Sequence, residues 1–335
     1  MRRSPRSSGA GRGAMRAPAR FAACALLAAA VLSAAAAPAR AQDDGPRAVR
    51  LETLDVSDNL YLLRGGGKNI LALVGFEGVV LIDTLGPGWG PATRAALDNL
   101  TALPVTTIIN THAHDGEIPA NHEFPAVTDV LAHENTRARM ARMAAFGGAN
   151  ARFLPNRTFS DTLALLDGID RIELHHFGPA HTDGDAFVVF PEKGIAYLGD
   201  LFAATAVPQV DPGAGGSGRG YPDVLAAALD EISYFPEFVR GPEVRTFDRV
   251  VPGRQEPPDQ TPLLDWLTWA DLERYTAFAR DFVAAVEQAH AAGRSLDDAS
   301  AAVAALADAY PDYALDAAGS AAEMIFSELD DDAGR

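Results

Sequence analysis

The sequence predicts an α/β fold in which two sheets pack together and are covered by helices. Short apolar runs bounded by turn residues alternate with longer helical patterns, and this layout occurs twice along the chain. Hydrophobic residues make up 48% and charged residues 22% of the 335 residues, as is ordinary for a folded globular protein. These values exclude a chain that is disordered throughout and a protein with several membrane spans.

The first half of this layout begins at about residue 59 and contains five predicted strands and two helices. The strands are expected at 60–63, 70–74, 79–82, 105–109 and 130–132, and the helices at about 91–100 and 134–143. A turn at 65–67 separates the first two strands. The fourth strand leads directly into Asn110-Thr111-His112, and α/β folds place their sites where strands end.

The second half has its own strands, followed by a helical end. Strands are expected at 163–166, 172–174, 186–190, 195–198 and 248–251, with a Gly-rich loop at 211–220 and a helix at 223–232. That loop is interpreted either as a rim over a pocket or as a plain surface loop. Helices are expected at 272–290 and, after the cap Ser295, at 296–307, followed by an acidic tail. We therefore expect one domain at 42–258, with a helical extension at 259–335 packed on it.

Residues 1–41 have the composition of a cleavable secretory signal. They contain seven arginines and no acidic residue, with an apolar run over 21–37 and the small-residue site Ala39-Arg40-Ala41. A membrane anchor is the alternative, but the run is Ala-rich and shorter than the roughly 20 residues of a span. We therefore expect cleavage before Gln42, a periplasmic or secreted protein, and no membrane span after cleavage.

Charge and cysteine content narrow the partners of the mature chain. Without the seven arginines it has 21 basic and 45 acidic residues, which argues against nucleic acid and leaves a small-molecule substrate as the expected partner. The single cysteine, Cys24, lies within the signal. Because no thiol remains, any metal must be held by His, Asp or Glu.

Three histidines and an aspartate follow separate predicted strands. His112 and His114 form an H-x-H pair in which alternate side chains point the same way. His181 lies in a turn before a strand, and Asp200 ends another strand. Three neutral imidazoles with a carboxylate nearby predict a zinc site that keeps an open position.

At these positions the sequence resembles the metallo-β-lactamase-fold hydrolases. The matching segments stand in the order and approximate spacing of that family, from about residue 55 to 258: Asn110-Thr-His-Ala-His114, Ala132-His-Glu-Asn135, His175-His-Phe-Gly-Pro-Ala-His-Thr-Asp-Gly-Asp185, Tyr197-Leu-Gly-Asp-Leu-Phe202 and Val250-Val-Pro-Gly253. The resemblance implies an αββα sandwich with metal at one edge of the two sheets. It also implies that Asp83 and Asp185 orient ligands and loops rather than bind the metal.

The chain departs from the family pattern at the second metal site. Gly116 and Glu117 stand where H-x-H-x-D-H has an acid and a histidine, and Arg254 replaces the histidine of Pro-Gly-His. Only Asp200 remains of that site, which favours one zinc ion over two. We interpret Arg254 as an electrostatic substitute for the missing cation, or as a clamp for an anionic substrate.

These observations predict an exported zinc-dependent hydrolase that acts on an ester, lactone, thioester or lactam. Asp200, together with Glu117 or Asp115, would orient the attacking water or carry its proton, and Arg254 would stabilise negative charge. One alternative is a non-catalytic periplasmic protein of the same fold that binds a metal or ligand. Another is a two-metal enzyme whose second site is shifted to Asp115 and Glu117.

Overall fold

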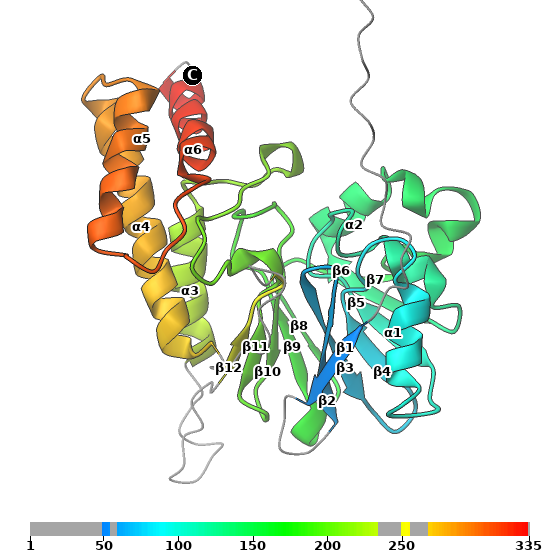
Figure 1. The fold of residues 1–335 in the computed structure, drawn as a ribbon. Coiled ribbons are helices and arrows are strands. Elements are labelled where there is room, and N and C mark those ends of the chain that lie inside the picture. Colours follow the sequence, from blue (N-terminus) through cyan, green and yellow to red (C-terminus); the bar gives the residue numbers. More distant parts are fainter. Residues whose placement is uncertain (1–48, 54–58, 234–248, 255–266, 334–335) are drawn as a thin grey trace, which may run out of the picture. The chain divides into compact units, whose positions relative to one another are not determined.

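The computed structural model describes residues 49–53, 59–233, 249–254 and 267–333. Residues from Pro46 to Arg335 form one compact unit. Two sheets face each other within it, and helices cover the outer face of each (Figure 1). The predicted signal at 1–41, its cleavage site and the predicted boundary at 258/259 lie outside the described residues.

The first sheet contains seven strands in chain order. They are β1 (Arg50–Thr53), β2 (Leu60–Gly65), β3 (Lys68–Val74), β4 (Val79–Ile82), β5 (Val105–Ile109), β6 (Asp129–His133) and β7 (Arg157–Phe159). The strands from β1 to β4 pair antiparallel, and those from β4 to β7 pair parallel. The helices α1 (Gly90–Leu97) and α2 (Glu134–Met140) belong to this half of the chain.

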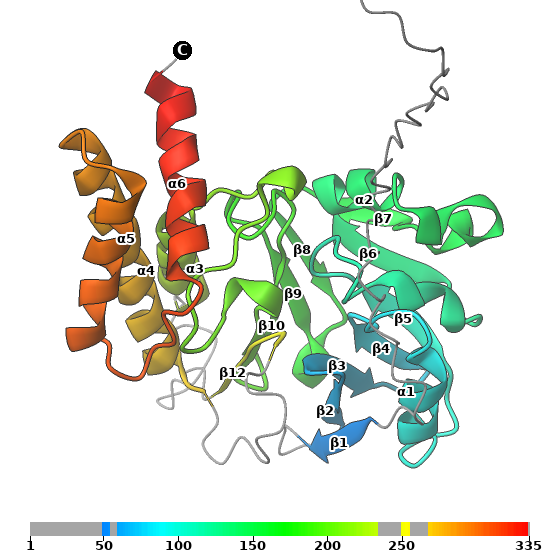
Figure 2. The same cartoon turned by 45° about the horizontal axis from the view of Figure 1, so that its top comes forward.

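The second sheet contains five strands in the order β12-β11-β10-β9-β8. They are β8 (Thr162–Leu165), β9 (Ile172–His175), β10 (Phe187–Phe190), β11 (Ile195–Tyr197) and β12 (Arg249–Val251). The helices α3 (Tyr221–Ser233), α4 (Trp269–Ala291), α5 (Leu296–Ala304) and α6 (Ala318–Ala333) gather on its outer side (Figure 2). Together, the two sheets and their helices form the predicted αββα sandwich.

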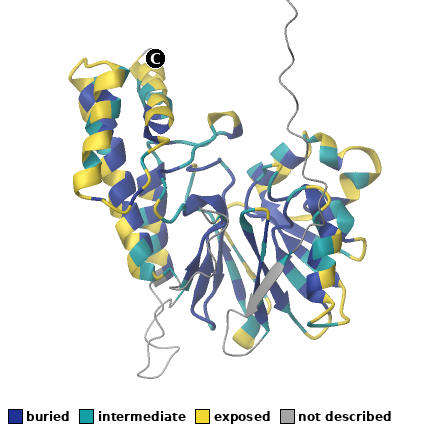
Figure 3. Ribbon diagram, in the orientation of Figure 1, coloured by how far each residue is buried: buried dark blue, intermediate teal, exposed yellow. Residues whose placement is uncertain are grey.

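Strand β10 shows how the sandwich is held together. All four of its residues are buried (Figure 3). Alternate side chains enter different cores. Val188 and Phe190 join the cluster between the sheets, whereas Phe187 and Val189 join the cluster under the helices. A strand with apolar side chains on both faces requires cover on both faces. The helical extension therefore packs on the second sheet and completes its outer core.

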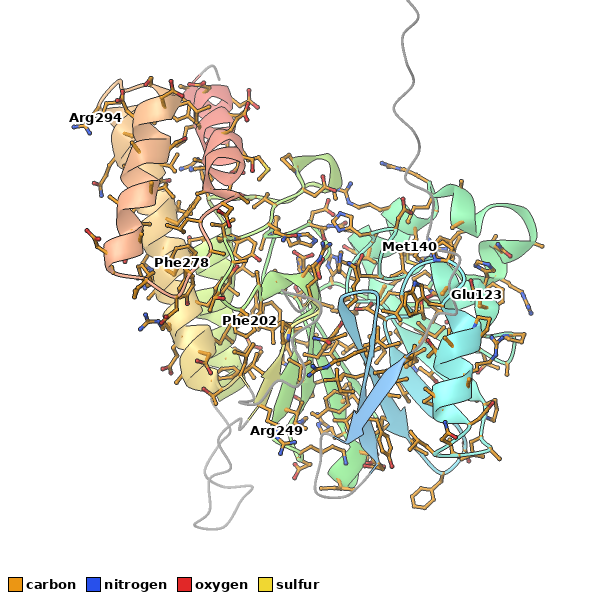
Figure 4. All side chains as sticks on the ribbon, in the orientation of Figure 1. Glu123, Met140, Phe202, Arg249, Phe278 and Arg294 are labelled. Atoms are coloured by element: carbon orange, nitrogen blue, oxygen red, sulfur yellow. The ribbon has the colours of Figure 1, made fainter. Side chains whose placement is uncertain are left out.

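Aromatic side chains fill the space between the second sheet and α4. Phe202 and Phe278, labelled in Figure 4, are fully buried members of this core, and the ring of Phe202 lies 5.3 Å from that of Tyr275 in an edge-on arrangement. Burial of each such side chain contributes about 1.5–3 kcal/mol. In the part of the chain that the structure describes, no helix is both long and apolar enough to cross a membrane.

The structure differs from the sequence prediction at both ends of the unit and at one edge strand. The strands β1 and β7, both at edges of the first sheet, were not predicted. The acidic tail is mostly helix α6. Its buried residues Ala318, Ala321, Ala322 and Ile325 follow the spacing of one helical face, whereas its acidic residues outnumber them and conceal this apolar stripe in the sequence.

Candidate metal centre

Four predicted side chains meet where segments of the two sheets end. His112 and His114 follow β5 of the first sheet, His181 precedes β10, and Asp200 lies in a short 3-10 turn after β11. One ligand atom from each lies within 4.8 Å of the others. This is the metal-ligating cluster found among the described residues, and His112, His181 and Asp200 in it are buried.

The outer nitrogen of each imidazole faces an acceptor. His181 Nδ1 lies 2.8 Å from the carbonyl oxygen of Gln209, and His114 Nε2 lies 2.7 Å from Asp211 Oδ2. His112 Nδ1 lies 3.0 Å from Thr111 Oγ1. Neither a carbonyl nor a carboxylate can donate, so His181 and His114 must place their protons on these outer nitrogens.

The hydroxyl of Thr111 fixes the third ring in the same way. Thr111 Oγ1 donates its own hydrogen to Asp83 Oδ2 at 2.7 Å, so it accepts from His112 Nδ1. The inner nitrogens His112 Nε2, His114 Nδ1 and His181 Nε2 then all carry lone pairs. These are the atoms that a divalent cation requires, in the tautomers that it requires.

The spacing of the inner atoms fits zinc. His181 Nε2 lies 3.0 Å from His114 Nδ1, and Asp200 Oδ2 lies 3.8 Å from both His112 Nε2 and His181 Nε2. Ligands about 2.1 Å from a tetrahedral zinc stand roughly 3.4 Å apart, close to these distances. Within the described chain, the buried atom His112 Nε2 finds no hydrogen-bond partner, as is expected of an atom that faces a cation.

Burial also favours the neutral form of the two buried rings, His112 and His181. It lowers the pKa of His181 to about 4, and it lowers the pKa of His112 well below its usual value, with the neighbouring imidazoles adding to the effect. Neutral imidazole is the form that binds a metal. The residues present therefore fit a single zinc ion held by three histidines, with Asp200 beside it.

A segment from Gln209 to Gly216 positions two of the three ligands. Besides its contact with His114, Asp211 accepts from the Ala214 amide through Oδ1 and donates its own amide to the His181 carbonyl at 2.9 Å. A β-carbon on Gly216 would lie 2.3 Å from that carbonyl, so only glycine fits there. The Gly-rich loop is thus a wall of the metal centre.

Asp83 and Asp185 orient their neighbours, as the resemblance implied. Asp83 accepts from the amide and hydroxyl of Thr111, and its backbone is held at φ 60, a strained conformation for a residue with a β-carbon. Asp185 accepts from the amide and hydroxyl of Thr182, which follows His181. Burial raises the pKa of each carboxyl to about 7, against the opposing effect of these hydrogen bonds.

Two positively charged side chains, Lys68 and Arg254, lie beside the three histidines. Arg254 Nε donates to Asp200 Oδ2 at 2.5 Å, and its Nη2 lies 3.7 Å from Glu117 Oε1. Lys68 Nζ contacts Glu117 Oε1 directly and lies 3.9 Å from Asp200 Oδ2. Two carboxylates and two cations therefore balance, which avoids the repulsion between buried Glu117 and Asp200.

Lys68 was not among the predicted site residues. It follows the glycine turn at 65–67 and begins β3, where a lysine is ordinarily exposed, so no local pattern signals its burial. In the fold it pairs with Arg254 in an isolated β-bridge, which brings both side chains to one corner. Burial lowers the pKa of Lys68 to about 8, with the nearby Asp200 acting in the opposite direction.

Asp115 does not join the site. Its side chain is exposed, and the metal-ligating group formed by the described residues does not include it. Asp115 stands one residue before the position at which the family pattern has its acid, and its carboxylate faces outward. Glu117, in contrast, is buried against Lys68. The structure thus gives no second metal site built on Asp115.

We expect Asp211→Asn to weaken zinc binding by about tenfold or more, because the amide is a poorer partner for the His114 N–H than the carboxylate is. Competition with a chelator measures this affinity. Asp115→Asn is the matched control, since it removes an exposed carboxylate nearby, and its affinity should equal that of the wild type. Equal affinities for all three proteins would contradict the role of Asp211.

Comparisons with known proteins point to one superfamily. The profile of the metallo-beta-lactamase superfamily matches residues 59–238. The alpha subunit of 2,4-dinitroanisole O-demethylase from Nocardioides sp. (strain JS1661) is 31% identical over 158 residues, which cover 45% of this chain and 46% of that protein. The chain thus matches about half the length of this curated relative.

Solved structures share the fold at low sequence identity. The DIM-1 metallo-beta-lactamase is 16% identical with a TM-score of 0.51, over 70% of this chain and 97% of its own. The inverting sec-alkylsulfatase Pisa1 from Pseudomonas sp. is 16% identical with a TM-score of 0.55, over 76% of this chain and 45% of its own. The profile match extends over more than half of the 335 residues, so the chain belongs to the metallo-beta-lactamase superfamily.

Proposed function

We propose that this protein is an exported hydrolase that works with one zinc ion. The observation that carries the proposal is the contrast between two neighbouring positions. At the first position, the lone pairs of His112, His114 and His181 point toward one another with no proton between them. At the second position, where the family has its second metal site, Lys68 and Arg254 occupy the space beside Glu117 and Asp200.

His112, His114 and His181 would hold the ion. A zinc ion there would lower the pKa of a water ligand toward about 7 and polarise an oxygen of the substrate. Asp200 Oδ2 accepts from Arg254 and also lies 3.8 Å from His112 Nε2 and His181 Nε2, so this carboxylate would stand beside the ion and its water. The carboxylate thus orients the nucleophile from a fixed position.

Among the four charged side chains of this corner, Arg254 is the one that a substrate reaches most easily. Its side chain is 34% exposed, against 16% for Lys68 and 5% for Glu117. A guanidinium at such a position stabilises negative charge that develops on a carbonyl oxygen or a leaving group. Lys68 and Glu117 lie deeper and hold Arg254 and Asp200 in place.

The proposed substrates are compounds that water can cleave at an activated bond to oxygen, sulfur or nitrogen: esters, lactones, thioesters and lactams. The relative from Nocardioides, named as an O-demethylase subunit, adds an activated methyl ether to the compounds worth testing. The rival function is metal or ligand binding without turnover, which the loss of the second metal site favours.

Purified mature protein should turn over at least one compound of a panel in proportion to its zinc content. The panel is 4-nitrophenyl acetate, a lactone, a thioester, a chromogenic cephalosporin and 2,4-dinitroanisole. His181→Ala should lower the rate at least about 100-fold, because loss of a metal ligand should cost more activity than loss of a group that only hydrogen-bonds to a ligand. His290→Ala is the control, because it removes an imidazole that lies against Asp330 and Phe326 of α6 and is not part of the metal-ligating cluster of the described residues. A zinc-loaded protein that binds these compounds without turnover would support the rival.

The wild type should contain about one zinc ion per chain, and rebuilding the second site should require removal of Lys68. A β-carbon on Gly116 would lie 2.7 Å from Lys68 Nζ, and a carboxylate there would hold the ammonium in place. We therefore expect Gly116→Asp/Glu117→His/Arg254→His to retain about one zinc ion, and the same variant with Lys68→Ala to approach about two.

Elemental analysis of the purified proteins measures these ratios. The single Arg254→His variant, which supplies one ligand but no acid at Gly116, is the control and should stay at about one. A wild type with two zinc ions, or a triple variant that gains the second ion while it keeps Lys68, would show that these cations do not take the place of a metal.

Export follows from the signal-like composition of residues 1–41. We expect the protein recovered from the periplasm or medium of a bacterial host to begin at Gln42, because Ala39-Arg40-Ala41 follows the apolar run directly. Intact mass spectrometry measures this end. Recovery with residues 2–41 still attached would contradict export by cleavage.

A further inference from the structure

Helix α6 of the helical extension is joined to the metal centre through one loop. The loop runs from Gln209 to Gly220 and has one side against the main chain around His181. There, the Ser217 amide donates to the Ala180 carbonyl at 2.9 Å, and a β-carbon on Gly220 would lie 2.8 Å from the Pro179 carbonyl. The loop therefore cannot move without moving the segment that contains His181.

The other side of this loop rests on α6. Glu328 accepts hydrogen bonds from Ser217 Oγ at 3.0 Å, from the Gly218 amide at 2.7 Å and from the Arg219 amide at 3.3 Å. Gly218 also lies against Ile325, since a β-carbon on it would come within 2.5 Å of that side chain. Three donors of one turn thus converge on a single carboxylate.

The convergence fixes the shape of the turn. Hydrogen bonds to a charged acceptor are roughly twice as strong as those between neutral groups. Ser217 Oγ, which donates to Glu328, also accepts from the Gly220 amide at 3.0 Å. Glu328 is therefore the acceptor around which residues 217–220 are arranged, and these residues lead into α3.

We propose that Glu328 is a positioning residue for the metal centre. It holds the 217–219 turn, the turn holds the segment from Gln209 to Gly216, and that segment supplies the acceptors that fix His181 and His114. The inference rests on the proposed function, because it takes these histidines to hold zinc. It assigns to α6 a role in the site, beyond cover for the second sheet.

The nearby ion pairs of Arg219 do not fill this role. Arg219 pairs with Glu287 of α4 at 3.0 Å and with Asp332 of α6 at 2.5 Å, and all three side chains are well exposed. Exposed pairs contribute little to stability. Arg219→Gln also leaves the backbone donors of the turn untouched, so we expect this variant to bind zinc as the wild type does.

Glu328→Gln tests the proposal because it keeps the length of the side chain and converts one acceptor oxygen into a donor that faces donors. Glu323→Gln, at an exposed position of the same helix, is the matched control. In competition with a chelator, we expect Glu328→Gln to bind zinc about tenfold more weakly, the scale found for partners that orient ligands. Glu323→Gln should match the wild type.

A second measurement does not involve the metal. In zinc-free protein, amide hydrogen exchange over residues 209–220 should be faster in Glu328→Gln than in the wild type, while exchange in β10 and α4 stays the same. Faster exchange throughout the chain would show a general loss of stability and would overturn the inference. Unchanged zinc affinity in Glu328→Gln would overturn it as well.

The two proposals fail in different ways. A wild-type protein that binds no zinc would overturn the proposed function and, with it, this inference. A wild type that binds zinc, together with a Glu328→Gln variant of equal affinity, would overturn the inference alone.

Discussion

The metal centre depends on three imidazole nitrogens that face one another with lone pairs. His181 Nε2 and His114 Nδ1 lie 3.0 Å apart, and neither carries a hydrogen, because the opposite nitrogen of each ring donates to Gln209 or Asp211. Two such atoms repel unless a cation lies between them. The fold supports this arrangement through outer partners on every ring, and this explains why a strained Asp83 and a tightly fitted Gly216 stand beside it.

Beside the three histidines, the groups that repel each other are carboxylates rather than lone pairs. Glu117 and Asp200 are buried close to each other, and two carboxylates in such a place disfavour each other's charge. Members of a fold can offset this with a second metal ion or with side-chain cations. Here, Lys68 and Arg254 do so, and β3 pairs with the residues around Arg254 to bring them together. A fixed pair of cations needs no metal supply, but it leaves less open coordination for a substrate.

Much of this could be predicted from the sequence, because the relevant signals are local. Alternating apolar runs located the strands that deliver His112 and Asp200, and the H-x-H pair and Gly-Pro-Ala-His segment located the ligands. The position of Arg254 in the family pattern suggested its role, and the structure places it on Asp200. The burial pattern of α6 was not predicted, because the acidic residues spaced along it and grouped at its end led to its interpretation as a tail.

Lys68 and Asp211 could not be predicted, because their roles arise from contacts across long stretches of chain. Lys68 meets Glu117 only after β3 is paired in the first sheet. The Asp-Pro-Gly sequence at Asp211 does signal a turn, and Asp211 Oδ1 caps that turn. Its second oxygen, however, reaches His114, 97 residues away, and no short pattern contains that information.

The distribution of the ligands over the fold links metal binding to stability. His112 and His114 extend from the first sheet, His181 stands in a loop of the second, and the loop that fixes two of them is held by α6. A zinc ion on these residues would join the two halves of the sandwich at the edge where the ligands meet. Because the unfolded chain cannot assemble this cage, binding would stabilise the folded state as a whole. The same contacts that prepare the ligands would then be those that the ion reinforces.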